Sequence, residues 1–290
     1  MSGCFDCGRW CMIVVVVAGA AFAGLAHAAD DPEAAAAKPV LLYSLYYHAE
    51  GEKQYLPDAS FSEVLKRLGE DFEVRCNAER PGRKALQGVS VLLIVNPSDR
   101  ARGGAEPPHF TEREVYEIAL FVQNGGGLVF MSNQTPAHNC EKKDSNRLLD
   151  HFGMKVTHFD VGVKVFDIPD AAPLVGGLKW KYIYGSILDV REDHFAQPQV
   201  LVENDPGVPV EVGPIGPAGS TTVGPSGEVG FRGPLLATAE VGKGRAVVGT
   251  DTGWMANTAI DQADNWEIAR RLYRWAAGFE DPISKTAPAE

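Results

Sequence analysis

The chain has little positive charge and no cluster of it. Lys and Arg together number 27 against 38 Asp and Glu, which gives a formal net charge of −11. Binding to nucleic acid requires clustered basic side chains that displace counterions from the phosphates. The sequence therefore excludes a general affinity for nucleic acid and leaves a small molecule, a glycan or a protein as the expected partner.

Long apolar runs are also missing. Met12 to Leu25 is an apolar run of about 14 residues, shorter than the roughly 20 that a membrane-spanning helix needs. Arg9 precedes it, and Ala26-His27-Ala28 has the small-x-small pattern of a signal-peptidase site. We expect residues 1–28 to be a cleaved signal peptide, with export to the periplasm or beyond and no stable membrane insertion afterwards. A retained membrane anchor is the alternative.

Cysteine is scarce in the part of the chain that should remain after cleavage. Three of the five cysteines, Cys4, Cys7 and Cys11, precede position 28. Cys76 and Cys140 are left, and an oxidising compartment would permit them to pair. The sequence does not decide whether they do.

Strand and helix patterns alternate after a polar linker at residues 29–38. Apolar runs at 40–46, 72–76, 89–95, 128–131 and 244–249 predict strands. Helices are predicted between them and at the end, with capping boxes at Ser60/Glu63, Thr111/Glu114 and Asp264/Glu267. This alternation is typical of right-handed βαβ units. We therefore expect one α/β domain over residues 39–279, a flavodoxin-like, mostly parallel sheet flanked by helices, and a disordered tail at 280–290.

The region from about 155 to 236 departs from this pattern, and we interpret it as a β-rich insertion before the last core strand. Its two collagen-like triplets, Gly213 to Gly219, are too few for a triple helix and predict a loop. Trp180, Tyr182 and Tyr184 alternate along a predicted strand and should share one face. Such a face is either part of the core or an exposed surface for sugars or proteins.

Several motifs occur in an order that resembles a known superfamily. They are Val89-Leu-Leu-Ile-Val-Asn-Pro, Phe110-Thr-Glu-Arg-Glu114, Phe121-Val-Gln-Asn-Gly-Gly-Gly-Leu-Val-Phe130, Gly242-Lys-Gly-Arg-Ala-Val-Val-Gly-Thr-Asp251 and Asp264-Asn265. Together they resemble the class I glutamine amidotransferase-like superfamily, in its non-amidotransferase branch of DUF4350-like domains. The resemblance covers most of residues 40–278 and implies the fold.

The same resemblance argues against amidotransferase activity in this chain. The amidotransferases of the superfamily carry a Cys on a tight elbow between a strand and a helix, with a His and a Glu later in the chain. Here the corresponding strand runs into Met131-Ser-Asn-Gln-Thr-Pro136, and Thr250-Asp-Thr-Gly-Trp254 lacks the His-x-Glu pair. The sequence therefore favours a non-catalytic binding domain without a cofactor. A hydrolase acting on a carbohydrate or an amide, with or without a metal, is the alternative.

Ligands of parallel α/β sheets bind at the carboxyl ends of the strands. The loops expected at that edge supply the candidate ligand-binding residues, namely Ser44, Tyr47, His48, Glu50, Asn96, Ser132, Asn133, Gln134, His138, Asp251 and Asn257. The alternative is that these side chains are polar only because loops are solvated.

Three narrower hypotheses concern these loops. His48, Glu50, His138 and Cys140 offer the N, O and S donors that zinc accepts. Cys140 with His138 as base would form a displaced nucleophile. Asp251 either binds a ligand or hydrogen-bonds its own loop backbone as an Asx-turn.

Overall fold

A computed structural model describes residues 37–133, 139–157, 161–207 and 232–280. The chain divides into residues 1–37 and residues 38–290, and the second unit contains the helices and strands of the domain. The signal peptide, Gln134, His138, the Gly213–Gly219 triplets and all of the tail except Glu280 lie outside the described residues, so the predictions made for them stay predictions.

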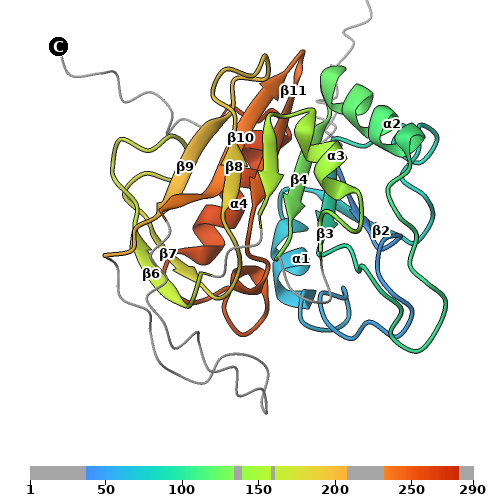
Figure 1. Cartoon of the computed structure of the whole chain (residues 1–290), viewed down its shortest axis with the longest axis horizontal. Coiled ribbons are helices and arrows are strands. Elements are labelled where there is room, and N and C mark those ends of the chain that lie inside the picture. Colours follow the sequence, from blue (N-terminus) through green and yellow to red (C-terminus); the bar gives the residue numbers. More distant parts are fainter. Residues whose placement is uncertain (1–36, 134–138, 158–160, 208–231, 281–290) are drawn as a thin grey trace, which may run out of the picture. The chain divides into compact units, whose positions relative to one another are not determined.

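A seven-stranded sheet forms the centre of the domain (Figure 1). Its strands, in spatial order, are β2 (Glu73–Asn77), β1 (Val40–Ser44), β3 (Val91–Val95), β4 (Gly127–Met131), β11 (Gly244–Gly249), β10 (Gly233–Val241) and β9 (Gln199–Asn204). The first five run parallel to one another, and β10 is antiparallel to both of its neighbours, β11 and β9. Every residue of β1, β3 and β4 is buried, as their continuous apolar runs predict. The prediction of a flavodoxin-like, mostly parallel α/β sheet is confirmed.

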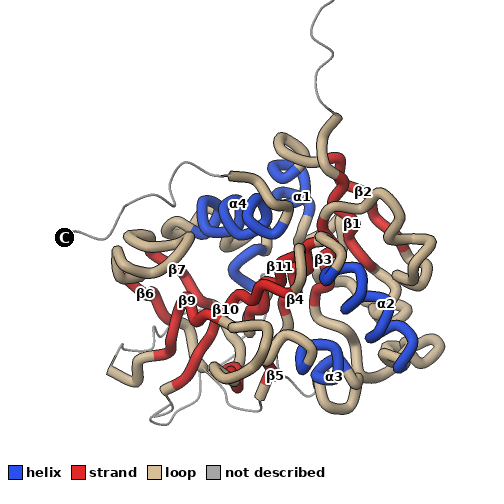
Figure 2. The backbone as a smooth tube through the Cα atoms, turned by 90° about the horizontal axis from the view of Figure 1, so that it is seen from above, coloured by secondary structure: helices blue, strands red, loops and turns tan. Residues whose placement is uncertain are grey.

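Helices cover both faces of this sheet (Figure 2). The helices α1 (Ser62–Leu68) and α4 (Asn265–Ala276) pack on one face, and α2 (Glu112–Gln123) and α3 (Ser145–Asp150) pack on the other. Each face therefore has a hydrophobic core of its own. Among the described residues, no helix combines the length and the apolar character needed to cross a membrane.

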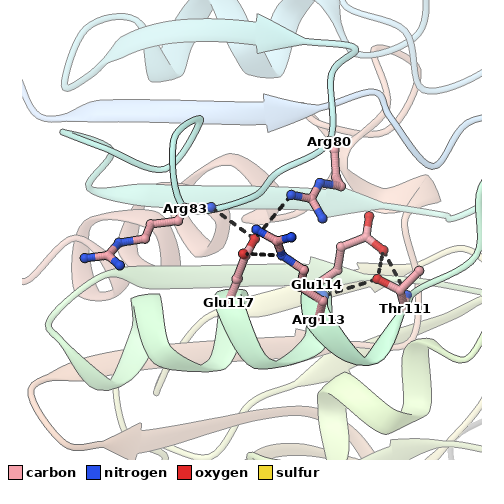
Figure 3. A network of polar contacts seen from close by, with 6 residues as sticks. All are labelled: Arg80, Arg83, Thr111, Arg113, Glu114 and Glu117. Atoms are coloured by element: carbon pink, nitrogen blue, oxygen red, sulfur yellow. Dashed lines mark hydrogen bonds and ion pairs between the residues drawn. The ribbon is translucent and has the colours of Figure 1, made fainter.

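One of the three predicted capping boxes forms. Thr111 accepts the Glu114 backbone N–H, and the Glu114 carboxylate accepts the Thr111 backbone N–H (Figure 3). The boxes at Ser60 and Asp264 are wrong, because both side chains have other partners. Ser60 Oγ accepts from Tyr55 N at 2.9 Å, and Asp264 Oδ2 accepts from Lys179 N at 2.7 Å.

The region predicted as an insertion contributes directly to the domain. Its strands β9 and β10 extend the main sheet, while β5 (Met154–Val156) pairs with β8 (Leu188–Val190) and β6 (Lys164–Asp167) pairs with β7 (Lys179–Tyr182). Trp180 and Tyr182 of β7 are fully buried, as the interpretation of a core strand requires. Tyr184 lies beyond the end of β7 and is only half-buried.

Cys76 and Cys140 do not form a disulfide with each other. Cys76 is exposed on the edge strand β2, and Cys140 is buried near the end of β4. The sequence left open whether the two cysteines pair, and their positions show that they do not.

Candidate functional site

Three strand ends meet in a buried network of side-chain amides and hydroxyls. Asn96 follows β3, Asn133 follows β4 and Thr252 follows β11. Asn96 Nδ2 donates to Thr252 Oγ1 at 2.8 Å, and Asn96 Oδ1 accepts from Asn133 N at 2.7 Å. Asn133 Oδ1 accepts from both the backbone N–H and the hydroxyl of Thr252, each at 2.8 Å. We call these three residues the asparagine network.

Asn96 adopts the left-handed backbone conformation, with φ at 40°. This conformation is uncommon for residues other than Gly, although Asn tolerates it better than most. It turns the chain sharply at the end of β3 and leaves the side chain 1% exposed. The strained backbone and the two hydrogen bonds together fix the amide between β4 and β11.

Asp251 ties the insertion to the end of β11. Its Oδ1 accepts from Gly253 N at 2.6 Å, which is the Asx-turn that the sequence suggested. Its Oδ2 accepts from Ile183 N at 2.6 Å and from Tyr184 N at 3.3 Å. Burial raises the pKa of this carboxyl to about 7, while the backbone N–H groups act in the opposite direction.

Residues 183–186 therefore cover the carboxyl ends of β4 and β11. Asn133 Nδ2 donates to the Tyr184 carbonyl at 2.9 Å, and Gly185 forms an isolated bridge with Asp251. The sequence predicted three of these residues, Asn96, Asn133 and Asp251, as ligand-binding. In the structure, the side-chain hydrogen bonds described above all go to partners inside the protein.

A second group of polar side chains lies where β1 and β3 end. Ser44 lies on the same face of β1 as Leu42, which packs toward α2 and α3. Ser98 N donates a hydrogen bond to the Tyr47 carbonyl at 2.9 Å. Tyr47 stacks on Phe110 with ring centroids 3.9 Å apart. Five buried side-chain oxygens here make no hydrogen bond within the described chain: Ser44 Oγ, Tyr47 OH, Ser98 Oγ, Asp99 Oδ1 and Glu114 Oε1. We call these five residues and Lys143 the strand-end cluster.

Burial and neighbouring charges shift the pKa values of two members of this cluster. Burial raises the pKa of Tyr47, and the neighbouring Glu114 carboxylate raises it further. Lys143 is fully buried, and its Nζ donates to the Pro107 carbonyl at 2.9 Å. Burial lowers the pKa of Lys143 to about 8, and the charge of Asp99 is the largest effect in the opposite direction.

The possible nucleophiles at the end of β4 are Ser132 and Cys140. The Cys140 thiol donates to Ser132 Oγ at 3.3 Å, and Ser132 Oγ donates to the Asn133 carbonyl at 3.3 Å. Both side chains are buried, and burial raises the pKa of the thiol to about 11. At neutral pH Cys140 is therefore protonated, whereas nucleophilic attack requires the thiolate.

The remaining predicted residues are dispersed. His48 Nε2 donates to the Val95 carbonyl at 2.8 Å, and Glu50 is exposed and accepts from Ala105 N at 3.2 Å. Among the described residues, no group of three or more His, Cys, Asp and Glu side chains is arranged to hold a metal. Since His138 lies outside those residues, the zinc hypothesis and the hydrolase alternative stay predictions.

Asn257 lies at the amino end of α1. Its Oδ1 accepts from Glu63 N at 3.0 Å, and its Nδ2 donates to the Ala59 carbonyl at 2.9 Å and to Ser62 Oγ at 2.8 Å. It thus satisfies backbone groups at the start of the helix, which is the role that the sequence assigned to Ser60. The interpretation of Asn257 as a ligand-binding residue finds no support in these contacts.

Four members of the strand-end cluster are not among the candidate residues of the sequence analysis: Ser98 and Asp99, which follow β3, and Glu114 and Lys143. Glu114 was visible only as part of a capping box, and nothing in the sequence around Lys143 distinguishes it from a surface lysine. Their positions follow from the packing of α2 and of residues 139–145 against the sheet, which a local pattern does not encode.

The family model for a domain of unknown function, DUF4350, matches residues 59–273. The chain belongs to this family. A comparison with curated proteins found no significant match.

Solved structures share the fold at low sequence identity. The N-terminal domain of mmIFT52 is 15% identical with a TM-score of 0.60, covering 83% of this chain and 99% of that one. A cytoplasmic protein from Salmonella typhimurium is 12% identical with a TM-score of 0.50, covering 82% and 98%. A ThuA-like protein from Bacteroides uniformis is 15% identical with a TM-score of 0.46, covering 83% and 93%.

Proposed function

We propose that this chain is a non-catalytic domain of the amidotransferase-like type that binds a small polar ligand at the strand-end cluster. In a sheet of strand order 2-1-3-4-5, ligands bind where the order reverses, between the first and third strands. The cluster occupies that position, because Ser44 ends β1 and Tyr47 follows it, whereas Ser98 and Asp99 follow β3.

The observation that carries the proposal is the set of five buried oxygens without a hydrogen-bond partner in the described chain. A buried polar atom left unsatisfied costs about 1–3 kcal/mol, and native proteins contain few of them. Five at one strand edge support a site whose hydrogen bonds are completed by a molecule from outside the chain.

The chemistry of the cluster favours a ligand rich in hydroxyl groups. Ser44, Tyr47 and Ser98 can donate or accept, whereas the carboxylate oxygens of Asp99 and Glu114 accept only. A hydroxyl group complements both kinds, because it donates one hydrogen bond and accepts others. A monosaccharide or a cyclic polyol therefore fits better than a purely anionic or a purely cationic molecule.

Thermal shift measurements with D-glucose, D-galactose and myo-inositol test this binding. We expect at least one of them to raise the Tm, and Tyr47→Phe and Ser98→Ala to remove the rise. In the absence of ligand, both variants should match or exceed the stability of the parent chain, because an unpartnered hydroxyl contributes no hydrogen bond. A loss above about 1 kcal/mol without ligand would show that the hydroxyls are already satisfied, and the proposal would fail.

The buried, protonated state of Cys140 supports the non-catalytic part of the proposal. Iodoacetamide at about pH 8 should alkylate the exposed Cys76 in the folded chain and Cys140 only after denaturation. Peptide mapping by mass spectrometry separates the two sites, and Cys76 serves as the internal control. Alkylation of Cys140 in the folded chain as fast as that of Cys76 would support an enzyme instead.

We further propose that the chain is exported and that cleavage follows Ala28. The charged start, the short apolar run and the small-x-small motif support this. N-terminal sequencing of the protein recovered from the periplasm or the medium should begin at Ala29. Recovery with Met1 intact in the membrane fraction would favour the retained anchor.

A further inference from the structure

A groove lies between β9 and the segment formed by β6 and the residues that follow it, on the far side of the domain from the strand-end cluster. Figures 1 and 2 both place β6 beside β9. The groove has a volume of about 920 Å³. Residues 165–169 and 171–173 form one wall, and residues 200–203, 205 and 207 form the other.

One wall of the groove is a sheet edge. β9 is the last strand in the order of the main sheet and pairs only with β10 among the described strands. The outer edge of such a strand presents backbone N–H and C=O groups to an added strand. An extended peptide uses these groups in β-augmentation, and pockets for alternate side chains then give specificity.

The opposite wall is held in place by a buried lysine. Lys164 of β6 is 1% exposed, and its Nζ donates to Asn204 Oδ1 at 2.9 Å and to the Asp205 carbonyl at 3.0 Å. These bonds fix the start of β6 to the end of β9. The groove is therefore preformed, which lowers the conformational entropy that this chain loses when a partner binds.

The charges at the groove select the kind of partner. Ten of the lining residues are apolar, three are carboxylates and none is Lys, Arg or His. Asp167 pairs with Lys179 and Asp205 with Arg232, whereas no described ion pair involves Glu203. A partner that places apolar side chains in the groove and cations beside Glu203 complements this surface.

We propose that β9 and the groove beside it bind an extended segment of a partner protein in which apolar and basic residues alternate. The segment adds a strand to the outer edge of β9, its apolar side chains fill the groove, and its basic side chains face Glu203. The six residues of β9 extend over about 20 Å, enough to pair with five or six residues of the partner. This inference uses a surface separate from the strand-end cluster and stands independently of ligand binding there.

Fluorescence anisotropy with two labelled peptides tests the proposal on the full chain. One is acetyl-Lys-Val-Lys-Val-Lys-Val-Lys-amide, and the other has Glu in place of each Lys. We expect the basic peptide to bind at least tenfold more tightly than the acidic one, with an affinity that falls as salt rises. A basic peptide N-methylated at alternate residues on its pairing edge should lose binding, because it keeps the charge but not the strand hydrogen bonds.

A matched pair of variants locates the interaction. Glu203→Lys should weaken binding of the basic peptide at least fivefold, whereas Glu192→Lys, the same charge change at an exposed position outside the groove, should leave it nearly unchanged. Equal affinity for both peptides, equal effects of the two variants or no binding to the full chain would overturn the proposal. So would binding that appears only after deletion of residues 208–231, or a concentration-dependent dimer that excludes the peptide, because the occupant would then be this chain itself.

Discussion

Replacing Asn133 by Ala should destabilise the domain more than any change of an exposed Asn. The side chain of Asn133 makes three hydrogen bonds in the asparagine network and to residues 183–186. Its removal leaves the backbone N–H and the hydroxyl of Thr252, which is fully buried, without these partners. At about 1–3 kcal/mol for each unsatisfied buried group, the expected loss is about 2–6 kcal/mol.

Urea unfolding followed by intrinsic fluorescence measures this loss, which should appear as a lower midpoint with an unchanged m-value. Asn77→Ala is the control, because Asn77 Oδ1 accepts from Glu79 N at an exposed position. We expect the control to change stability by less than about 0.5 kcal/mol. If Asn133→Ala changes stability as little as the control does, the network does not hold the strand ends together and the reasoning is refuted.

Three further predictions concern the same domain. Asp251 has a pKa of about 7 in the folded chain against an ordinary value of 3.8. Its contribution to stability is therefore fully present below about pH 4 and is lost as the pH rises through about 7. The free energy of unfolding should change by about 4 kcal/mol over this range. Urea titrations at several pH values should show this change in the parent chain and not in Asp251→Asn. A Cβ at Gly185 would stand 1.8 Å from the Thr250 carbonyl oxygen. Gly185→Ala should thus cost about 3 kcal/mol or more in thermal unfolding, while Gly207→Ala, whose Cβ would meet only the Asp205 side chain at 3.3 Å, should be tolerated. Thr111→Ala removes a capping box and should lower stability by about 1 kcal/mol in the same assay, and an unchanged Tm would contradict the cap.

The central sheet was predictable because its strands are locally encoded. Val91–Val95 and Gly127–Met131 are continuous apolar runs bounded by turn residues, and the structure places both at the middle of the sheet. The antiparallel addition of β9 and β10 was not predictable, since a strand pattern contains no information about its neighbour. The pairing of β9 with β10 is defined only when the whole sheet has assembled.

The candidate site was predictable in position but only partly in detail. The sequence placed Asn96, Asn133 and Asp251 at strand ends, where the structure has them. It did not show that Asn133 bonds to Thr252, or that Asn257 bonds to the start of α1, because each pair is separated by more than a hundred residues of chain. Side-chain partners at such distances follow from the packed fold rather than from spacing.

The pairing of β4 with β11 determines how late in synthesis the parallel sheet can be completed. Gly127 of β4 pairs with Arg245 of β11, roughly a hundred residues further along the chain. During synthesis, one edge of the half-built parallel sheet stays open until nearly the whole chain has left the ribosome. Contacts so far apart in sequence form slowly, so a nascent chain of this fold stays unfolded for longer than one built from local contacts. Such a delay is compatible with the export that we propose, in which the chain crosses a membrane before it folds.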